Sequence, residues 1–378
     1  MNPFRPSFGS SPPEFAGRHE LINEFVLALE EGPGSPGRAT LYVGPRGSGK
    51  TVLLNQIEDV AREHGWWVIS ENATPGLVQR LATDHLPALL ADHDPQARTT
   101  KVKSLSAPLG MGGASWETTE AHPRQLSMRS QLGAAADLMA ERGNGVLITV
   151  DEIHGGHADE LRELAMAVQH SFREQRQVAF AAAGLPAAVN ERLLRDQLIT
   201  FLRRAERYVL GPLEPYEVAE ALQRPIEASG RSITPEALDA AVQLSEGYPF
   251  LVQLVGYHLW RQHPDTPTIT ISEVKAATPA IIRRVGTLVH EPSLSEISDV
   301  DREFLRAMAV DDGPSRISDI AERLGVDSNY ATKYRSRLLA AELIIAPARG
   351  YIDFELPYMR TYLRTRSRDL DVHQIDRH

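Results

Sequence analysis

One short segment of the chain matches the phosphate-binding pattern G-x-x-x-x-G-K-[ST] at every fixed position: Gly44, Pro45, Arg46, Gly47, Ser48, Gly49, Lys50 and Thr51. Residues 38–43 predict a short buried strand before this loop, and residues 52–57 predict the first turns of a helix after it. In that context the glycines let backbone N–H groups surround phosphates, and the helix N-terminus adds partial positive charge. The segment therefore predicts an α/β fold with a P-loop on a parallel-sheet core, and the binding of a nucleoside triphosphate.

The side chains of this loop have distinct expected roles. Lys50 would neutralise phosphate charge, and the Thr51 hydroxyl would ligate Mg²⁺. Val52, the next residue, completes the set expected to bind the nucleotide. The alternative, a glycine-rich turn that binds nothing, does not account for the strand and the helix on either side.

A second element of the site is a strand that ends in two carboxylates. Residues 146–150 are apolar or β-branched and predict a strand buried on both faces, and Asp151 and Glu152 follow at its end. Asp151 is expected in the Mg²⁺ shell, and Glu152 is expected to polarise the attacking water. Acidic residues also solvate ordinary strand ends, but this pair follows a complete phosphate loop. ATP and Mg²⁺ are therefore the expected cofactors, and Glu152 and Lys50 are expected catalytic residues of an ATPase.

Together, GPRGSGKT and VLITVDE resemble the AAA+-type P-loop ATPases, and more narrowly the branch with origin-recognition/Cdc-like proteins, archaeal-type ATPases and STAND signalling ATPases. The resemblance covers roughly residues 10–290. Residues 15–21 resemble the box that lies against adenine in such proteins, which implies that Arg18 contacts the nucleotide. Residues 247–251 resemble the G-x-P element of the lid, which implies that Pro249 packs on the nucleotide. The alternatives are a surface arginine for Arg18, and a helix stop followed by a new helix start around Pro249.

Two further positions follow from the same resemblance. Arg203 and Arg204 precede a predicted strand, where the family carries the arginine finger that completes the site of a neighbouring subunit. A solvated helix end explains this arginine pair equally well. At the sensor position, where the family usually has a polar residue near the γ-phosphate, this chain has Ala182, Ala183 and Gly184. We therefore expect slow hydrolysis, as in a nucleotide switch.

The pattern of apolar residues divides the chain into four parts. Residues 1–212 are expected to form the ATPase core, and residues 213–290 predict four short helices that suit the lid of this class. A loop at residues 291–293 is expected to separate the lid from a third unit, residues 296–368. Residues 369–378 form a tail.

The third unit resembles a winged helix-turn-helix, with three predicted helices followed by two predicted strands. Its third helix carries Lys333, Arg335 and Arg337, which could reach phosphates and base edges of duplex DNA. However, residues 301–378 contain 13 Lys or Arg and 13 Asp or Glu, so the strongly basic surface of many DNA-binding domains is missing. A winged helix that binds protein is therefore the alternative.

Bulk properties exclude several other classes. The chain contains no cysteine, no apolar run long enough to span a bilayer, and no hydrophobic segment typical of a signal peptide near Met1. A cytoplasmic protein without a membrane partner is the expectation. Residues 97–130, rich in Ser, Thr, Gly and Pro, predict an insertion for DNA or partner contacts, or a surface loop. His154 and His157 lack the partners of a metal site and are interpreted as loop histidines.

Two functions fit these patterns. The first is an ATP-driven switch that acts on DNA, in which subunits of a homo-oligomer could complete one another's sites. The second is a STAND-type signalling or scaffold ATPase whose winged helix binds protein. DNA-stimulated turnover would favour the first function, and ATP-dependent oligomerisation without a DNA effect would favour the second.

Overall fold

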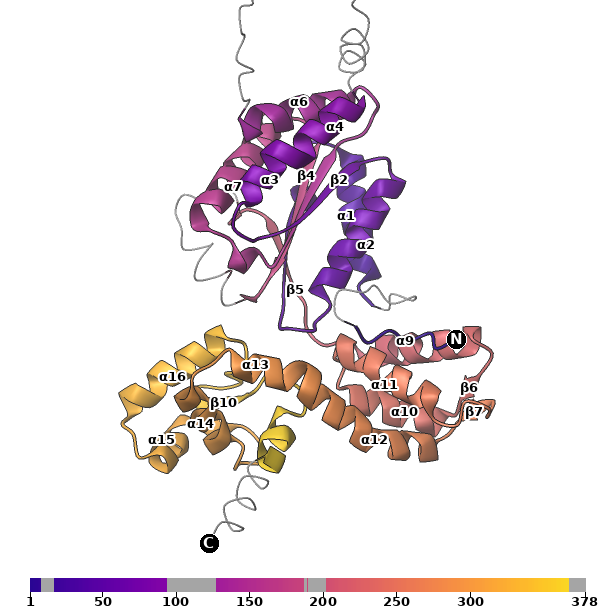
Figure 1. Ribbon diagram of the computed structural model, residues 1–378, viewed down its shortest axis with the longest axis vertical. Helices are drawn as coiled ribbons and strands as arrows, with labels where there is room; N and C mark the ends of the chain where they lie inside the picture. Colours follow the sequence, from indigo (N-terminus) through magenta and orange to yellow (C-terminus); the bar gives the residue numbers. More distant parts are fainter. Residues whose placement is uncertain (8–16, 94–126, 187–188, 190–201, 367–378) are drawn as a thin grey trace, which may run out of the picture.

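A five-stranded parallel sheet organises the first half of the chain (Figure 1). The computed structural model describes residues 1–7, 17–93, 127–186, 189 and 202–366. The strand order is β2-β3-β4-β1-β5, and every neighbouring pair is parallel. The strands are β1 (Ala39–Val43), β2 (Trp67–Asn72), β3 (Val146–Asp151), β4 (Val178–Gly184) and β5 (Glu206–Val209). The predicted α/β core with a parallel sheet is confirmed.

Both faces of this sheet are covered by helices, which explains why its central strands are almost entirely buried and mostly apolar. Leu41 and Val43 of β1 face one layer, while Tyr42 between them faces the other. The Tyr42 layer contains α1 (His19–Glu31) and α2 (Lys50–Glu63). The opposite layer contains α3 (Leu77–Arg80), η2 (Leu81–His85), α4 (Leu86–His93), α6 (Met128–Ala140) and α7 (Ala158–Arg173). A three-layer sandwich results, in which the carboxyl ends of β1, β3 and β4 lie at one edge.

A helical unit follows the sheet and corresponds to the expected lid. It contains α9 (Pro215–Ala228), β6 (Ser232–Ile233), α10 (Pro235–Ser245), α11 (Pro249–Arg261), β7 (Thr268–Ile269) and α12 (Ile271–Val285). The Thr234 hydroxyl accepts a hydrogen bond from the backbone N–H of Ala237 at 3.3 Å, which caps α10 as its sequence predicts. Phe4, near the N-terminus, is 2% exposed and packs against Gly256 of α11, where a Cβ atom would clash with its ring. Residues 1–7 therefore lie against this unit.

The prediction of a loop at residues 291–293 is wrong. The chain stays helical from α12 through a π-helical turn, η5 (Gly286–His290), into α13 (Glu291–Ser295). Pro292 cannot donate a backbone hydrogen bond, and it directly follows the π-helical turn, where the regular i to i−4 hydrogen-bond pattern has already changed. The helical unit and the C-terminal unit that follows it are thus joined by a helical segment.

The C-terminal unit contains three labelled helices, a further helical stretch at residues 359–366, and a small antiparallel sheet, β8-β10-β9. Its elements are α14 (Asp299–Met308), β8 (Ser315–Arg316), α15 (Ile317–Leu324), α16 (Ser328–Ala340), β9 (Ile344–Ile345) and β10 (Tyr351–Phe354). This is the element order expected of a winged helix-turn-helix, with the additional strand β8. In the part of the chain that the structure describes, no helix has the length and apolar character needed to cross a membrane.

Candidate functional site

The phosphate loop joins β1 to α2 at the carboxyl edge of the sheet. Gly47 and Gly49 have φ angles of +75° and +89°, a region that residues with a Cβ atom rarely adopt. Gly47 also lies directly under the ring of Tyr248, so that a Cβ atom added there would clash with the Tyr248 hydroxyl. The backbone N–H of Gly44 donates to the carbonyl oxygen of Gly184 at 3.4 Å, which ties the loop to the end of β4. Gly47 and Gly49 therefore allow the backbone conformation of the loop, and Gly47 also allows Tyr248 to pack closely against it.

Lys50 begins α2 and turns back over the loop that precedes it. Its ammonium group donates to the carbonyl oxygens of Gly44 at 2.7 Å and Pro45 at 3.0 Å, and the residue is 6% exposed. Burial lowers the pKa of Lys50, while the negative charges of Glu152 and Glu342 raise it. A buried cation is thus held at the point where the sequence predicts phosphate.

Thr51 and Asp151 meet at the same edge. The Thr51 hydroxyl donates to Asp151 Oδ2 at 2.5 Å, although the two residues are far apart in sequence. A hydroxyl and a carboxylate are oxygen ligands of the kind that Mg²⁺ prefers, and Mg²⁺ usually takes only one or two such protein ligands beside phosphates and water. This donor pair therefore fits Mg²⁺. No cluster of three or more His, Cys, Asp or Glu suited to a metal occurs among the described residues.

Glu152 follows β3 with a φ angle of +50°, and its backbone N–H donates to Asp151 Oδ1 at 2.8 Å. The Glu152 carboxylate lies 3.0 Å from Nε2 of His154. No pattern in the sequence indicates this contact, and the prediction of an ordinary loop histidine at His154 does not include it.

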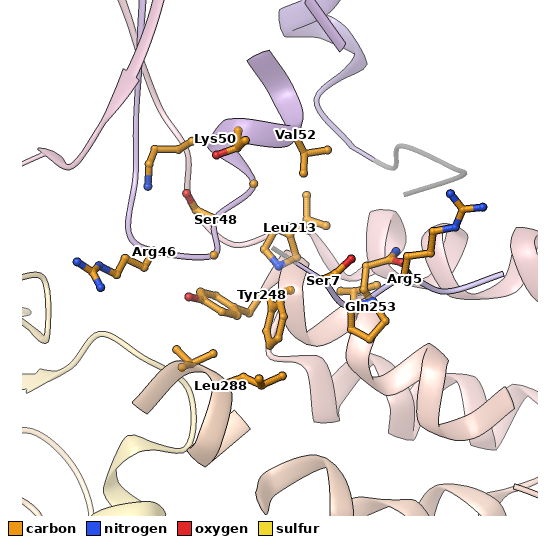
Figure 2. A pocket seen from close by; sticks show the side chains of 18 of the residues that line it. Arg5, Ser7, Arg46, Ser48, Lys50, Val52, Leu213, Tyr248, Gln253 and Leu288 are labelled. Atoms are coloured by element: carbon orange, nitrogen blue, oxygen red, sulfur yellow. Dashed lines mark hydrogen bonds between the residues drawn. The ribbon is translucent and has the colours of Figure 1, made fainter. Parts of the chain in front are cut away.

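Lys50, Thr51 and Glu152 line a cavity of about 600 Å³ between the sheet and the helical unit. In the view of Figure 2, Arg46 and Lys50 lie at one end, Arg5 and Gln253 at the other, and Tyr248 between them. Sequence analysis missed Arg5 and Gln253, since neither belongs to a recognisable motif.

Arg18 and Pro249, both expected to contact the nucleotide, also line this cavity, as does Val52. The Arg18 guanidinium donates to the carbonyl oxygen of Gly211 at 2.7 Å, while its Nη1 atom is buried without a hydrogen-bond partner. Burial lowers the pKa of Arg18 to about 10, and the charge of Glu217 opposes that shift. Arg18 and Pro249 therefore line the same cavity as the phosphate loop, although both are distant from that loop in sequence.

A comparison with known families agrees with this geometry. Residues 14–180 match the family described as AAA ATPase domain. This chain carries an AAA ATPase domain. Residues 287–363 match a family described as a domain of unknown function (DUF8462). A search of the curated proteins found no match.

Several solved structures are similar to this chain at low sequence identity. The ORC2 protein of Aeropyrum pernix, in ADPNP and ADP complexes, has 14% identity and a TM-score of 0.59, over 96% of this chain and 98% of that chain. The Thermotoga maritima RuvB Holliday junction branch migration motor has 19% identity and a TM-score of 0.47, over 93% and 96%. Cdc6p of Pyrobaculum aerophilum has 15% identity and a TM-score of 0.47, over 95% and 96%. At such identity, the likeness to the ORC2 protein concerns the fold.

The C-terminal unit contacts the phosphate loop of the AAA ATPase domain. Both guanidinium nitrogens of Arg46 donate to the Glu296 carboxylate, at 3.0 and 2.7 Å. Glu342, just after α16, is 8% exposed; its negative charge opposes the lowering of the Lys50 pKa by burial and adds to the effect of Glu296, which raises the pKa of Arg46. Nothing in the sequence links these positions, which are separated by more than two hundred residues.

The Arg46–Glu296 pair leads to a test of competition at the loop. Phosphates would compete with Glu296 for Arg46, so Glu296→Gln is expected to tighten nucleotide binding about two- to five-fold, the range of a solvent-exposed ion pair. Fluorescence titration with a labelled ATP analogue measures this shift. Glu303→Gln removes the same charge from an exposed position in α14 and should leave the affinity unchanged. An unchanged affinity in Glu296→Gln would exclude competition.

Arg203 and Arg204 lie in the turn before β5, and both are exposed. Neither is among the described residues that line the cavity of their own AAA ATPase domain.

The three cations predicted to contact DNA differ in their surroundings. Lys333 of α16 is exposed, and Arg335 is half-buried with its Nε atom unpartnered. Arg337 forms an ion pair with Asp301, donates to the Ser298 hydroxyl at 3.1 Å, and so holds the start of α14. Lys333 is the best placed of the three for an external partner. The predicted insertion falls mostly outside the described residues, as does Phe15 of the adenine box.

Proposed function

We propose that this protein is an ATP-binding, slowly ATP-hydrolysing molecular switch. The observation that carries the proposal is the convergence of Lys50, the Thr51–Asp151 pair and Glu152 at one edge of the sheet, beside a cavity of about 600 Å³. Each of these groups has the chemistry that phosphoryl transfer to water requires. The match of residues 14–180 to the AAA ATPase family supports the same activity.

In the proposed reaction, the chain's own residues bind and orient the reactants. The Arg46 and Lys50 cations face the phosphates, and Thr51 and Asp151 would hold Mg²⁺, which neutralises charge that develops on the phosphate oxygens. Glu152 orients the attacking water and accepts its proton. Slow turnover is proposed because β4 ends in Ala182, Ala183 and Gly184, which provide no polar side chain for the water or the γ-phosphate.

We further propose that duplex DNA is the partner of the C-terminal unit, through the exposed side of α16. The exposed Lys333 supports this proposal. The fold shared with the Aeropyrum pernix ORC2 protein is compatible with it but does not by itself define a partner. Arg203 and Arg204 of a neighbouring subunit would complete the site in a homo-oligomer.

A STAND-type signalling role is the second candidate, and a specific observation favours it. Arg337 is occupied by Asp301 within the unit, so one of the three cations proposed to face DNA is already neutralised. A surface with little net positive charge binds DNA weakly but can bind protein well.

The experiment that separates these candidates is ATP turnover with and without duplex DNA, at low and at physiological salt. We expect DNA to stimulate turnover at low salt and the stimulation to fade as salt rises, because phosphate contacts are salt-sensitive. Lys333→Ala should weaken DNA binding about three- to ten-fold in a gel-shift titration, while Lys275→Ala, an exposed lysine of α12, should not. Turnover that is indifferent to DNA, together with ATP-dependent oligomerisation, would instead support the signalling role.

A further inference from the structure

The end of β4 provides backbone groups but no polar side chain to the site. The absence of a side chain at Gly184 has a steric reason. A Cβ atom added to Gly184 would lie 2.8 Å from a methyl carbon of Ile153 and 3.4 Å from Nδ1 of His154. The space that a side chain at this position would need is therefore filled by η3 (Ile153–Gly155), the turn that follows Glu152. Among the three described atoms nearest to that position, the one polar atom belongs to this turn.

His154 carries that polar atom, and both of its ring nitrogens have partners. The backbone N–H of Leu185 donates to His154 Nδ1 at 3.4 Å, and His154 Nε2 lies 3.0 Å from Glu152 Oε2. A backbone N–H can only donate, so Nδ1 must be unprotonated and the ring proton must lie on Nε2. Nε2–H then donates to the Glu152 carboxylate.

The same stretch of backbone also reaches the phosphate loop. The carbonyl group of Gly184 and the N–H group of Leu185 belong to a single planar peptide unit. Its carbonyl oxygen accepts from the Gly44 N–H at 3.4 Å, and its N–H donates to His154. One peptide unit thus connects the loop, through the imidazole, to Glu152.

We propose that His154 is a positioning residue for Glu152, which it orients through a hydrogen bond anchored on the Gly184–Leu185 peptide. The proposal rests on the proposed ATPase function, in which Glu152 orients the attacking water. The Glu152 side chain is 55% exposed, and without a partner it would be distributed over several rotamers. The His154 side chain is 17% exposed and has a hydrogen-bond partner at each ring nitrogen. It provides, from the turn after Glu152, the polar group that the end of β4 lacks.

The first test compares variants of His154 by steady-state kinetics. His154→Phe keeps a planar ring but removes both nitrogens, and it is expected to lower kcat about 10- to 100-fold, with KM and nucleotide affinity within about two-fold. His154→Gln, whose amide N–H can donate to Glu152, should recover most of the lost kcat. The matched control is His157→Phe, an exposed histidine of the same loop, which should behave like the wild type. A wild-type kcat in His154→Phe would overturn the proposal.

A double-mutant cycle separates positioning from an independent effect. In a Glu152→Gln background, measured under single-turnover conditions, His154→Phe should cause no further loss of rate. The same fractional loss in both backgrounds would show that His154 acts without Glu152, and would overturn the positioning role.

A measurement without turnover distinguishes failure of this inference from failure of the proposed function. Long-range ¹H–¹⁵N spectra report which imidazole nitrogen carries the proton, with the His154 signals identified by their loss in His154→Phe. The expected tautomer has the proton on Nε2, and a proton on Nδ1 would overturn the inference. If this tautomer is present but the wild-type protein does not hydrolyse ATP, the proposed function fails and the hydrogen-bonded pair stands.

Discussion

Lys50→Ala is expected to weaken ATP binding at least about 100-fold, which in practice removes it from the range of a fluorescence titration. The ammonium group is 6% exposed and is held by two carbonyl oxygens of the loop, so its charge lies where phosphate is expected, with little competing water. Truncation of one partner in a buried charge contact typically costs about 2–5 kcal/mol, and about 2.7 kcal/mol corresponds to 100-fold.

The matched control is Lys275→Ala, which removes an exposed lysine of α12 and should leave nucleotide affinity within about two-fold. Thermal denaturation of both variants shows whether the fold persists, since Lys50→Ala also leaves the Gly44 and Pro45 carbonyl groups without their donor. If folded Lys50→Ala bound ATP within three-fold of the wild-type affinity, the loop would not be the phosphate site.

Glu152→Gln is expected to separate binding from chemistry. The amide keeps the shape of the carboxylate but cannot accept a proton from water, so kcat should fall about 10²- to 10⁴-fold while ATP affinity stays within about three-fold. Phosphate release measures turnover, and a fluorescence titration measures ATP affinity. Both are compared between Glu152→Gln and the wild type, with Mg²⁺ present and after its removal by EDTA. Glu163→Gln, an exposed glutamate of α7, is the matched control. If Glu152→Gln kept more than a tenth of the wild-type turnover, the water-orienting role would belong to another group.

The parts of the site that the sequence predicts share one property: their signal is local. The phosphate loop, and the strand that ends in Asp151 and Glu152, combine a hydrophobic pattern with a chemical motif over fewer than ten residues. The parallel sheet follows from such strands, because the carboxyl ends of parallel strands meet at one edge. The convergence of Thr51 and Asp151 at that edge is what this rule predicts.

The parts that the sequence does not predict depend on contacts between distant positions. The Arg46–Glu296 pair and the Tyr248 ring over Gly47 each join separate units, and neither pairing leaves a pattern in the chain. Strand β8 has two residues, too few for a recognisable alternation. The helical path through Pro292 departs from a local rule, because proline usually marks a helix boundary, whereas here it follows a π-helical turn within a continuous helical path.

The apolar core beyond the sheet has a mechanical consequence. A single cluster of buried side chains runs from Leu251 of α11 through Val285 of α12 to Phe304 of α14 and Leu338 of α16. A close-packed interior of this kind transmits displacement instead of absorbing it, and a helical path from α12 through η5 to α13 joins the two units. We therefore expect the two units to act as one lever. A rotation where Pro249 meets the phosphate loop would therefore move the α16 surface that carries Lys333 and, at the same time, alter the Arg46–Glu296 contact.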